Sequence, residues 1–461
     1  MSAKHHYRMK AAENLSPSMA SGQKWKEFLF PKLHRIAEFF TSQGITTAGN
    51  LLYGLLCVRL LPIPDYAQFA VVFGFLGTLT VLMDIGISST LLPLIGEQID
   101  NLQLIADYVA SLRQLAHWLY LGVAPFIIIV YPIVVQRQHW NLHIVSAMVA
   151  ILLVAGWCAR ISGAYGAVLI ARRDRTFWYR VQMASSLGTL ALLGIVWSLH
   201  WLNAFSAISI NVLGIVFSGA VYYLRARHLL GVKGHPSKQK RQAIVHLAMP
   251  VMPNTIFYAF QGQISLLLIT WFGRSTAVAG IGALSRLSRI FILLTQMNPL
   301  LIEPYFARLS PDRVKRNYLG LLAAEVAFCL LITSMAWRFP QVFLWVLGPK
   351  YSNLRIEVLI LIASSSMGFL CEVLWTINTS RRFVYWWNGA TTIFYTLAVE
   401  ILFIWKVDLS TVRSVLVLNL ATAVGVLLIN ITTGVYGFMR GPRETTQALV
   451  ALEQVAPVEQ R

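Results

Sequence analysis

Two arginines stand three residues apart in the middle of an apolar stretch of this chain. Arg286 and Arg289, interleaved with Ser285 and Ser288, share one face if the stretch is helical. A guanidinium group stays charged and binds phosphate oxygens through two parallel hydrogen bonds, so such a pair beside a cavity would attract a phosphate or pyrophosphate group. The alternative is an internal ion pair with an acid on another helix, for which Glu325 is the candidate.

Other charges inside apolar stretches matter because each costs about 2.5 to 3.5 kcal/mol to insert into a membrane. Arg160 is a further candidate for binding the substrate. Arg59 is either an interface anchor or a gate residue. For Asp84 we expect an inner-gate or capping role, with an ion site as the alternative. Each of three acids is either a site that couples transport to a proton or sodium ion or the partner of a buried arginine. They are Glu325, Glu372 and Glu400.

Two stripes of uncharged polar residues also follow helical spacing. The first contains Gln43, Thr46, Thr47 and Asn50. The second begins just after Pro250 and Pro253, which should kink or break the helix, and contains Asn254, Tyr258, Gln261 and Ser265. Both stripes predict a hydrated cavity whose amides and hydroxyls bind a polar cargo such as a sugar. The alternative is hydrogen bonding between packed membrane helices.

The elements that position these residues are membrane helices. The chain has 461 residues, of which 57% are hydrophobic and only 12% are charged. An ordinary soluble chain has about 25% charged residues. Stretches long enough to cross a bilayer predict an all-α integral membrane protein with about twelve spans, at 36–60, 66–90, 115–136, 144–170, 177–198, 202–224, 246–272, 275–305, 316–337, 356–378, 384–405 and 414–438.

The basic residues give the orientation of the chain. Most of the 38 lysines and arginines lie in alternate connections, together with both termini. The positive-inside rule therefore predicts cytoplasmic termini. The charge of +19 is dispersed over many short segments, as expected for residues that set the orientation of the membrane helices. It forms no single basic patch, which excludes a nucleic-acid partner. The four cysteines show no metal-ligand spacing, and we expect no metal or cofactor.

The spans divide into two lobes around a central cavity. The longest predicted cytoplasmic connection contains two glycines and a proline and separates six spans from six. We expect a basic N-terminal segment at 1–35, an N-lobe at 36–224, a basic linker at 225–241, a C-lobe at 242–438 and a cytoplasmic tail at 439–461. Such a division into two halves is typical of secondary transporters.

Enzymatic function is not expected. The chain has no Walker A motif for a nucleotide, no HExxH metal motif and no GxSxG elbow. The predicted external connections are each too short to hold a catalytic domain, which disfavours a membrane-bound glycan polymerase or ligase.

Several short stretches resemble the polysaccharide-exporter and O-antigen (Wzx-type) flippases of the multidrug/oligosaccharidyl-lipid/polysaccharide superfamily. In the first half they are NLLYGLLCVRLL at 50–61, DYAQFAVVFG at 65–74 and DIG at 84–86. In the second half they are PVMPN at 250–254, QGQ at 261–263, GALSRLSRI at 282–290, PYFARL at 304–309 and LGPKYSNL at 347–354.

The resemblance implies a twelve-helix transporter that moves undecaprenyl-pyrophosphate-linked oligosaccharide across the bacterial inner membrane by alternating access. Its partners would be membrane lipid, the lipid-linked substrate and, as candidates, a glycan polymerase and glycosyltransferases. The rivals are a cation-coupled multidrug exporter of the same superfamily, a membrane glycan polymerase or ligase, and a structural partner of glycan-synthesis enzymes.

Overall fold

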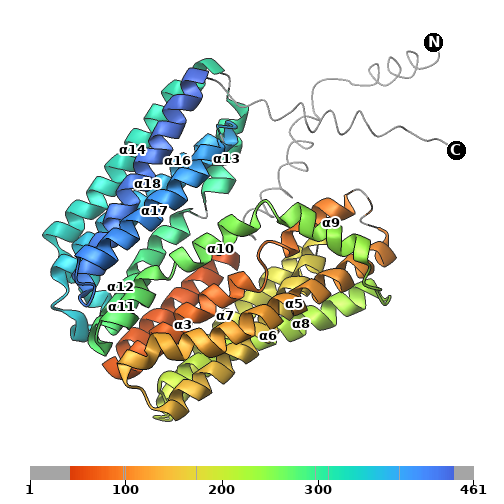
Figure 1. Cartoon of the computed structure of the whole chain (residues 1–461), viewed down its shortest axis with the longest axis horizontal. Helices are drawn as coiled ribbons and strands as arrows, with labels where there is room; N and C mark the ends of the chain where they lie inside the picture. Colours follow the sequence, from red (N-terminus) through yellow and green to blue (C-terminus); the bar gives the residue numbers. More distant parts are fainter. Residues whose placement is uncertain are drawn as a thin grey trace, which may run out of the picture.

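The computed structural model describes residues 42–440 except 97, 99, 173, 296, 310 and 384. The segment expected at 1–35 and all but the first two residues of the tail expected at 439–461 lie outside this part of the chain. The described residues form helices and connecting turns arranged as two bundles that converge at one end and separate toward the other (Figure 1). The prediction of an all-α membrane fold is confirmed.

The first bundle carries the chain from residue 42 to Leu230. After a helix over 42–60, it contains α3 (Ile63–Leu82), η1 (Ser88–Thr90), α4 (Leu91–Ile95), α5 (Leu102–Val135), η2 (Gln136–Gln138), α6 (Leu142–Ala171), α7 (Arg175–Ser198) and α8 (Ala204–Leu230). An asparagine stands before each of α5, α6 and α8, and its side chain accepts a hydrogen bond from a backbone N–H of the first turn. These caps explain why the helices begin where they do.

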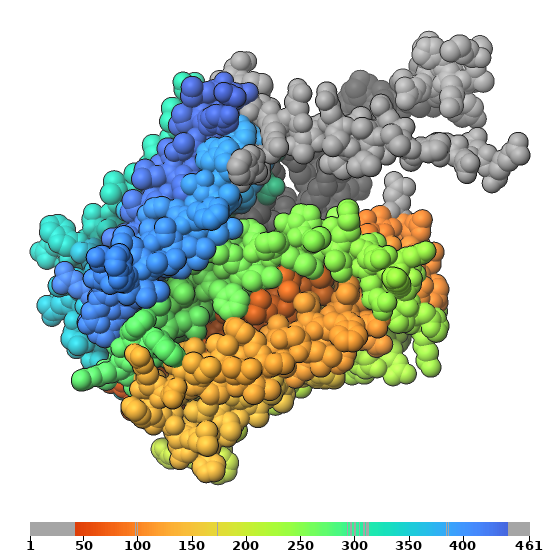
Figure 2. All heavy atoms as spheres, viewed as in Figure 1, coloured from red at the N-terminus to blue at the C-terminus, as the bar shows by residue number. Residues whose placement is uncertain are grey.

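The second bundle follows a connecting helix, α9 (Lys238–Ala248). It contains α10 (Met252–Gln261), α11 (Ile264–Phe272), α12 (Ser275–Thr295), α13 (Asn298–Arg308), α14 (Pro311–Arg338), α15 (Pro340–Leu347), η3 (Pro349–Tyr351), α16 (Arg355–Ser380), α17 (Trp386–Lys406) and α18 (Val412–Arg440). In Figure 2 the green segment that includes α10 lies between the blue bundle and the orange bundle.

The seventh predicted span, at 246–272, is broken as its prolines predict. The axes of α9 and α10 are bent by 59° across a break of three residues that contains Pro250. Pro253 occupies the first turn of α10, where a missing N–H costs no hydrogen bond. A second interruption at Gly262 and Gln263 separates α10 from α11.

Three other predicted spans have different bounds. The second span, predicted at 66–90, ends at Leu82, where a turn through residues of positive φ replaces the helix. The third, predicted at 115–136, begins at Leu102, because an amphipathic segment continues the helix before its most apolar part. The eighth, predicted at 275–305, divides into α12 and α13.

Fewer of the described helices qualify as membrane spans than the twelve that the sequence predicts. Within residues 42–440, nine helices are long and apolar enough to cross a membrane, or up to ten if the bent pair α9 and α10 is one span. The helix over 42–60 and α12 occupy the positions of the first and eighth predicted spans but are not among the nine. Twelve crossings therefore remain a prediction.

The two bundles are tied together at the end where the helix over 42–60 finishes. Arg59 donates from Nε to the carbonyl of Val346 over 2.9 Å and from a terminal nitrogen to the carbonyl of Trp345. Lys350 donates back to the carbonyls of Arg59 and Leu61 over 2.9 and 2.8 Å. We call these contacts the Arg59 latch.

A second tie at the same end involves Gln138 of the first bundle. Its amide nitrogen donates to the carbonyls of Thr270 and Gly273 over 2.7 and 2.9 Å, and its oxygen accepts from the hydroxyl of Ser275 over 2.9 Å. The bundles are therefore closed against each other at this end.

Candidate functional site

A polar cavity of about 510 Å³ lies inside the first bundle. Five helices of that bundle supply most of its wall, and α12 of the second bundle adds one residue, Arg289. Hydroxyl and amide side chains dominate the lining, which includes Thr46, Asn50, Thr80, Ser162, Gln182, Ser185, Ser186, Thr189, Asn211 and Ser218. Arg289 and Asp84 are its charged members.

Hydrogen bonds between helices fix the wall of this cavity. Ser186 of α7 donates to the carbonyl of Thr46 over 3.1 Å and contacts Oδ1 of Asn50 at 3.3 Å. Tyr53 donates from its hydroxyl to the carbonyl of Ala207 in α8. The first predicted stripe therefore combines its two alternatives. Thr46 and Asn50 line the cavity, and both also bond to a neighbouring helix.

Gln43, the first member of that stripe, is half-buried and is not among the residues that line the cavity. Its backbone carbonyl accepts a hydrogen bond from the hydroxyl of Thr47 over 2.7 Å. A part in substrate binding stays a prediction for Gln43.

Asp84 stands at the edge of the cavity, just after α3. Its carboxylate accepts from the backbone N–H of Ser88 over 2.8 Å and thereby caps the turn that leads into η1. That turn passes through Ile85 at φ 42° and Gly86 at φ 80°. The capping alternative for Asp84 is thus seen directly, while a gate function stays a prediction.

Arg286 and Arg289 occupy different environments, although the sequence predicts that both face the cavity. Arg289 lines the polar cavity and lies with its guanidinium carbon 5.2 Å from the ring centre of Phe73. Arg286 is not part of the cavity lining and is only 3% exposed. Three helical positions separate them, enough to place one in the cavity wall and the other in the packing beside it.

Arg286 packs into the first bundle among aromatic rings. Its guanidinium carbon lies 4.2 Å from the ring centre of Phe73 and 5.6 Å from that of Phe69, and its Nε is 3.5 Å from the hydroxyl of Tyr66. On the other side it lies against Gly54. Cation–π contacts of this kind are worth about 2 kcal/mol when they are desolvated.

Neither arginine pairs with the acid proposed for it. Among the described residues, no ion pair joins Arg286 or Arg289 to a carboxylate. Glu325 lies on α14, which packs against α15 and α16 rather than α12. The internal ion pair with Glu325 is therefore wrong for this structure, because the two helices that would carry it are not neighbours.

The acids Glu372 and Glu400 also lack an arginine partner within the described chain. Glu400 is 6% exposed, and its Oε1 has no hydrogen-bond partner. The side chain of Gln261 approaches Glu400, and Glu372 lies near Tyr258. Pairing with a buried arginine, the alternative to a coupling site, is thus wrong for these two acids.

The second polar stripe does not face the polar cavity. Asn254 and Tyr258 are exposed, Gln261 lies toward Glu400 of α17, and Ser265 donates to Oδ1 of Asn419 over 2.6 Å. None of these residues is among those that line the cavity. The broken seventh helix instead presents them to the second bundle and to the space between the bundles.

Arg160 and Arg59 lie apart from the cavity. Arg160 lines a separate pocket between α5, α6 and α8. Arg59 belongs to the latch, so that it holds the two bundles together and does more than anchor the chain at an interface. The structure therefore separates the three arginines that the sequence proposes for substrate binding: Arg289 lines the cavity, Arg286 lies in the packing beside it, and Arg160 lines another pocket.

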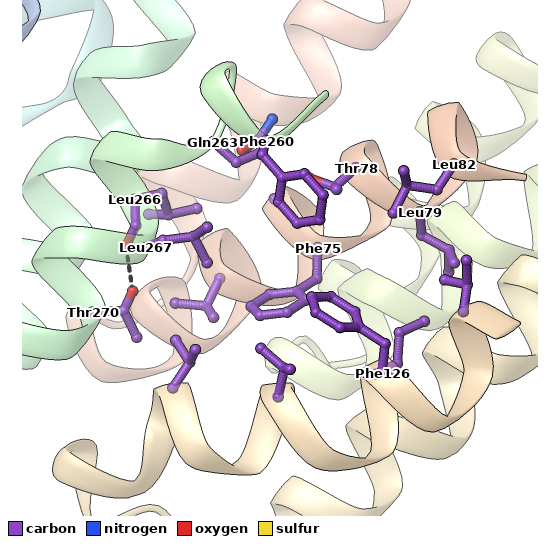
Figure 3. Close-up of a pocket in the computed structure, with 16 residues that line it drawn as sticks. Phe75, Thr78, Leu79, Leu82, Phe126, Phe260, Gln263, Leu266, Leu267 and Thr270 are labelled. Carbon is purple, nitrogen blue, oxygen red and sulfur yellow. Dashed lines mark hydrogen bonds between the residues drawn. The ribbon is translucent and has the colours of Figure 1, made fainter. Parts of the chain in front are cut away.

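An apolar pocket of about 130 Å³ lies between the bundles (Figure 3). Residues of α3 and α5, such as Phe75 and Phe126, face Phe260 and Leu267 of the broken helix across it. At 100° per residue, the α3 positions that line this pocket fall on the face opposite to those that line the polar cavity. Helix α3 thus separates a polar surface from an apolar one.

Two polar stripes of the cavity were missed by the sequence analysis. They are Gln182, Ser185, Ser186 and Thr189 on α7, and Asn211, Ser218 and Tyr222 on α8. The α7 stripe follows the same i, i+3, i+4, i+7 spacing as the first stripe, whereas the α8 residues stand at i, i+7 and i+11. The signal was present in the sequence and is weaker in α8, where Gly214 and Ile215 occupy the intervening positions.

Neither a protein-family model nor a curated protein matches the sequence. Solved structures do match its fold. The lipid II flippase MurJ in an inward closed conformation has a TM-score of 0.63 at 12% identity, over 92% of this chain and 93% of that chain. An inward-facing multidrug resistance MATE family transporter of the MOP superfamily has a TM-score of 0.61 at 15% identity, over 89% and 96%.

An outward-facing structure of a MATE family transporter is less similar, with a TM-score of 0.51 at 15% identity, over 91% of this chain and 95% of that chain. The chain therefore has the fold of MOP superfamily transporters.

Proposed function

We propose that this protein is a transporter that flips a lipid-linked oligosaccharide, with an undecaprenyl pyrophosphate carrier, across the bacterial inner membrane. The observation that carries the proposal is the chemistry of the polar cavity. Its wall combines many uncharged hydroxyls and amides with one arginine, and its acid, Asp84, is already held by the N–H of Ser88. Such a surface suits a sugar joined to an anion.

Arg289 is the residue that would meet the pyrophosphate. It reaches the cavity from α12 of the second bundle, whereas most of the wall belongs to the first. An anion bound there would contact both bundles and so favour the arrangement that brings them together. Arg286 acts as a positioning residue, because it holds α12 against α3 through Phe73.

Helix α3 offers separate surfaces for the two chemically different parts of such a substrate. The polar cavity on one face supports the glycan, and the apolar pocket on the other face supports a place for part of the lipid between the bundles. Movement then follows alternating access, with the Arg59 latch closing the external end while the cavity is reached from the cytoplasm.

Transport can be tested with purified protein in liposomes that contain a polyprenyl-pyrophosphate-linked oligosaccharide. Arg289→Gln should reduce the flipping rate at least tenfold, because one charged contact to phosphate is lost. Arg413→Gln, which removes an exposed arginine at the start of α18, is the control and should transport at the wild-type rate. Undiminished transport by the Arg289 variant would contradict the head-group assignment.

A cation-coupled multidrug exporter is the second candidate, since a MATE family transporter shares the fold. A cavity whose free charge is a guanidinium repels a cationic drug, which argues against it. Expression in a drug-sensitive strain distinguishes the two functions. Resistance to hydrophobic cations together with unchanged surface glycan would favour the exporter.

A further inference from the structure

A second cationic pocket lies on the outer side of the first bundle. Its volume is about 370 Å³, and it is formed by α5, α6 and α8. Two arginines, Arg113 and Arg160, line it together with three aromatic side chains, Trp157, Tyr165 and Tyr223. No acidic residue is among its lining residues, and within the described chain neither arginine forms an ion pair.

Arg160 is built into this pocket. It is 8% exposed, and its guanidinium carbon lies 3.9 Å from the ring centre of Trp157. One terminal nitrogen is 3.3 Å from Nδ1 of His117, and Nε has no hydrogen-bond partner among the residues that the structure describes. A buried guanidinium with an unused donor is costly unless an anion completes its contacts.

Arg113 supplies a second charge from the neighbouring helix. One of its terminal nitrogens donates to the hydroxyl of Tyr165 over 3.3 Å, and its side chain is otherwise exposed. Two guanidinium groups from adjacent helices thus line one pocket, and guanidinium groups are the donors that bind phosphate oxygens through paired hydrogen bonds.

The pocket faces away from the polar cavity. On α6 the residues that line it are 157, 158, 160, 161 and 165, whereas the cavity is lined by 159, 162 and 163. At 100° per residue these sets fall on opposite faces of the helix. Large apolar side chains around the pocket are exposed, among them Val154, Leu213 and Phe217. This is a surface that lipid chains would cover.

The position of the pocket along α5 can be compared with that of α9, a basic helix that packs against α5. Arg241 of α9 donates to Oε1 of Gln114 over 2.6 Å, and Lys240 donates to Asp107 over 2.5 Å. Gln114 is next to Arg113 in α5. The pocket therefore lies at the height along α5 where α9 packs, and α9 begins in the linker whose basic residues predict that it is cytoplasmic. Basic pockets between membrane helices at the cytoplasmic interface are typical sites for anionic head groups.

We propose that this pocket binds the phosphate of an anionic glycerophospholipid such as phosphatidylglycerol. Arg160 and Arg113 hold the phosphate, Trp157 stacks on the guanidinium of Arg160, and the acyl chains run along the exposed apolar side chains of α6 and α8. The lipid would thereby join three helices of the first bundle at the end where the two bundles are apart.

Native mass spectrometry of the full chain, released from detergent with added phosphatidylglycerol or phosphatidylcholine, tests the proposal. We expect phosphatidylglycerol to bind at least tenfold more tightly. Arg160→Gln and Arg113→Gln should each weaken its binding about fivefold, because one basic residue near an anionic lipid contributes roughly that factor. Arg338→Gln, an exposed arginine beside Phe339 on α14, is the matched control and should bind as wild type.

Arg160→Lys controls for a folding defect at the buried position. It keeps the positive charge, so we expect it to retain most of the binding. Arg113→Gln changes an exposed side chain and tests the site independently. Equal binding of the two lipids, or wild-type binding by both Gln variants, would overturn the proposal. Displacement of phosphatidylglycerol by millimolar inorganic phosphate, or by an equal amount of a polyprenyl pyrophosphate, would also overturn it, because either would identify a different source of the phosphate.

Discussion

Gly54 leaves the space that Arg286 occupies. A β-carbon on Gly54 would stand 3.0 Å from Cδ of Arg286 and 3.1 Å from one of its terminal nitrogens. Because Arg286 is buried against Phe73 on its other side, it cannot move away freely. The contact joins the first helix of one bundle to α12 of the other.

Substitution of Gly54 should therefore destabilise the protein. We expect Gly54→Ala to lower the free energy of unfolding by about 1 to 3 kcal/mol, the usual cost of forcing extra volume into a packed site. Thermal unfolding in detergent measures the effect. Gly44→Ala in the same helix is the control, because no atom of residues 42–440 as described lies within 4 Å of its β-carbon position. Equal unfolding temperatures for the two variants would show that Arg286 adapts.

The Arg59 latch should control access from the end that it closes. Arg59→Gln removes two hydrogen bonds from a charged donor, worth about 1.5 to 3 kcal/mol each. We expect the closed arrangement to lose population and Cys57, which is fully buried in the preceding turn, to react at least tenfold faster with a maleimide.

This labelling experiment needs a background in which Cys158, Cys329 and Cys371 are alanine. Gln341→Ala, which alters an exposed residue close to the latch, serves as the control. An unchanged rate for the Arg59 variant would mean that the tie through Gln138 is sufficient to hold the bundles closed.

The uncharged wall of the cavity should matter for transport and not for folding. Asn211→Leu preserves the size of the side chain and removes an amide from the cavity. We expect transport to fall about tenfold, as happens when a polar substrate group is left without its partner, while the unfolding temperature changes little. Asn317→Leu is the control, because Asn317 bonds only within its own helix, to the carbonyl of Arg313.

Glu400 should tolerate the loss of its ionisable group. A carboxylate that is buried without a cation is costly, so we expect the group to be uncharged in the native protein. Glu400→Gln should then change the free energy of unfolding by less than about 1 kcal/mol, since Gln has the same shape and can still bond to Gln261.

Glu357→Gln is a suitable comparison for this experiment, because Glu357 is an acid in the first turn of the same bundle's α16. A loss of more than about 3 kcal/mol at Glu400 alone would indicate a buried ion pair that this arrangement does not contain.

Much of the fold follows from the sequence. Apolar length predicts the helices, and the prolines at 250 and 253 predict the bend of the seventh span. The third span begins thirteen residues early because the helix continues through an amphipathic segment that contains Asp107 and Arg113. Conversely, the predicted eighth span is divided between α12 and α13, a break that its apolar composition alone does not reveal.

The candidate site is predicted less completely. Spacing identifies Arg286 and Arg289 as one helical face but cannot say that aromatic rings of α3 enclose the first and leave the second in the cavity. Arg160 has the same sequence signature and lies in a different pocket, since which side of α6 meets the bundle interior depends on packing with α8. Long-range packing, and not local pattern, decides these three cases.

The interruptions of the seventh helix also bear on how the protein enters the membrane. At 1.5 Å per residue, α10 and α11 are each about 15 Å long, roughly half the thickness of the hydrocarbon core. Neither can cross alone, and carbonyls of both helices accept hydrogen bonds from the first bundle: Ala259 of α10 from Thr78 and Thr270 of α11 from Gln138. We therefore expect the carboxy-terminal half to insert stably only after the amino-terminal half has folded and can supply these partners.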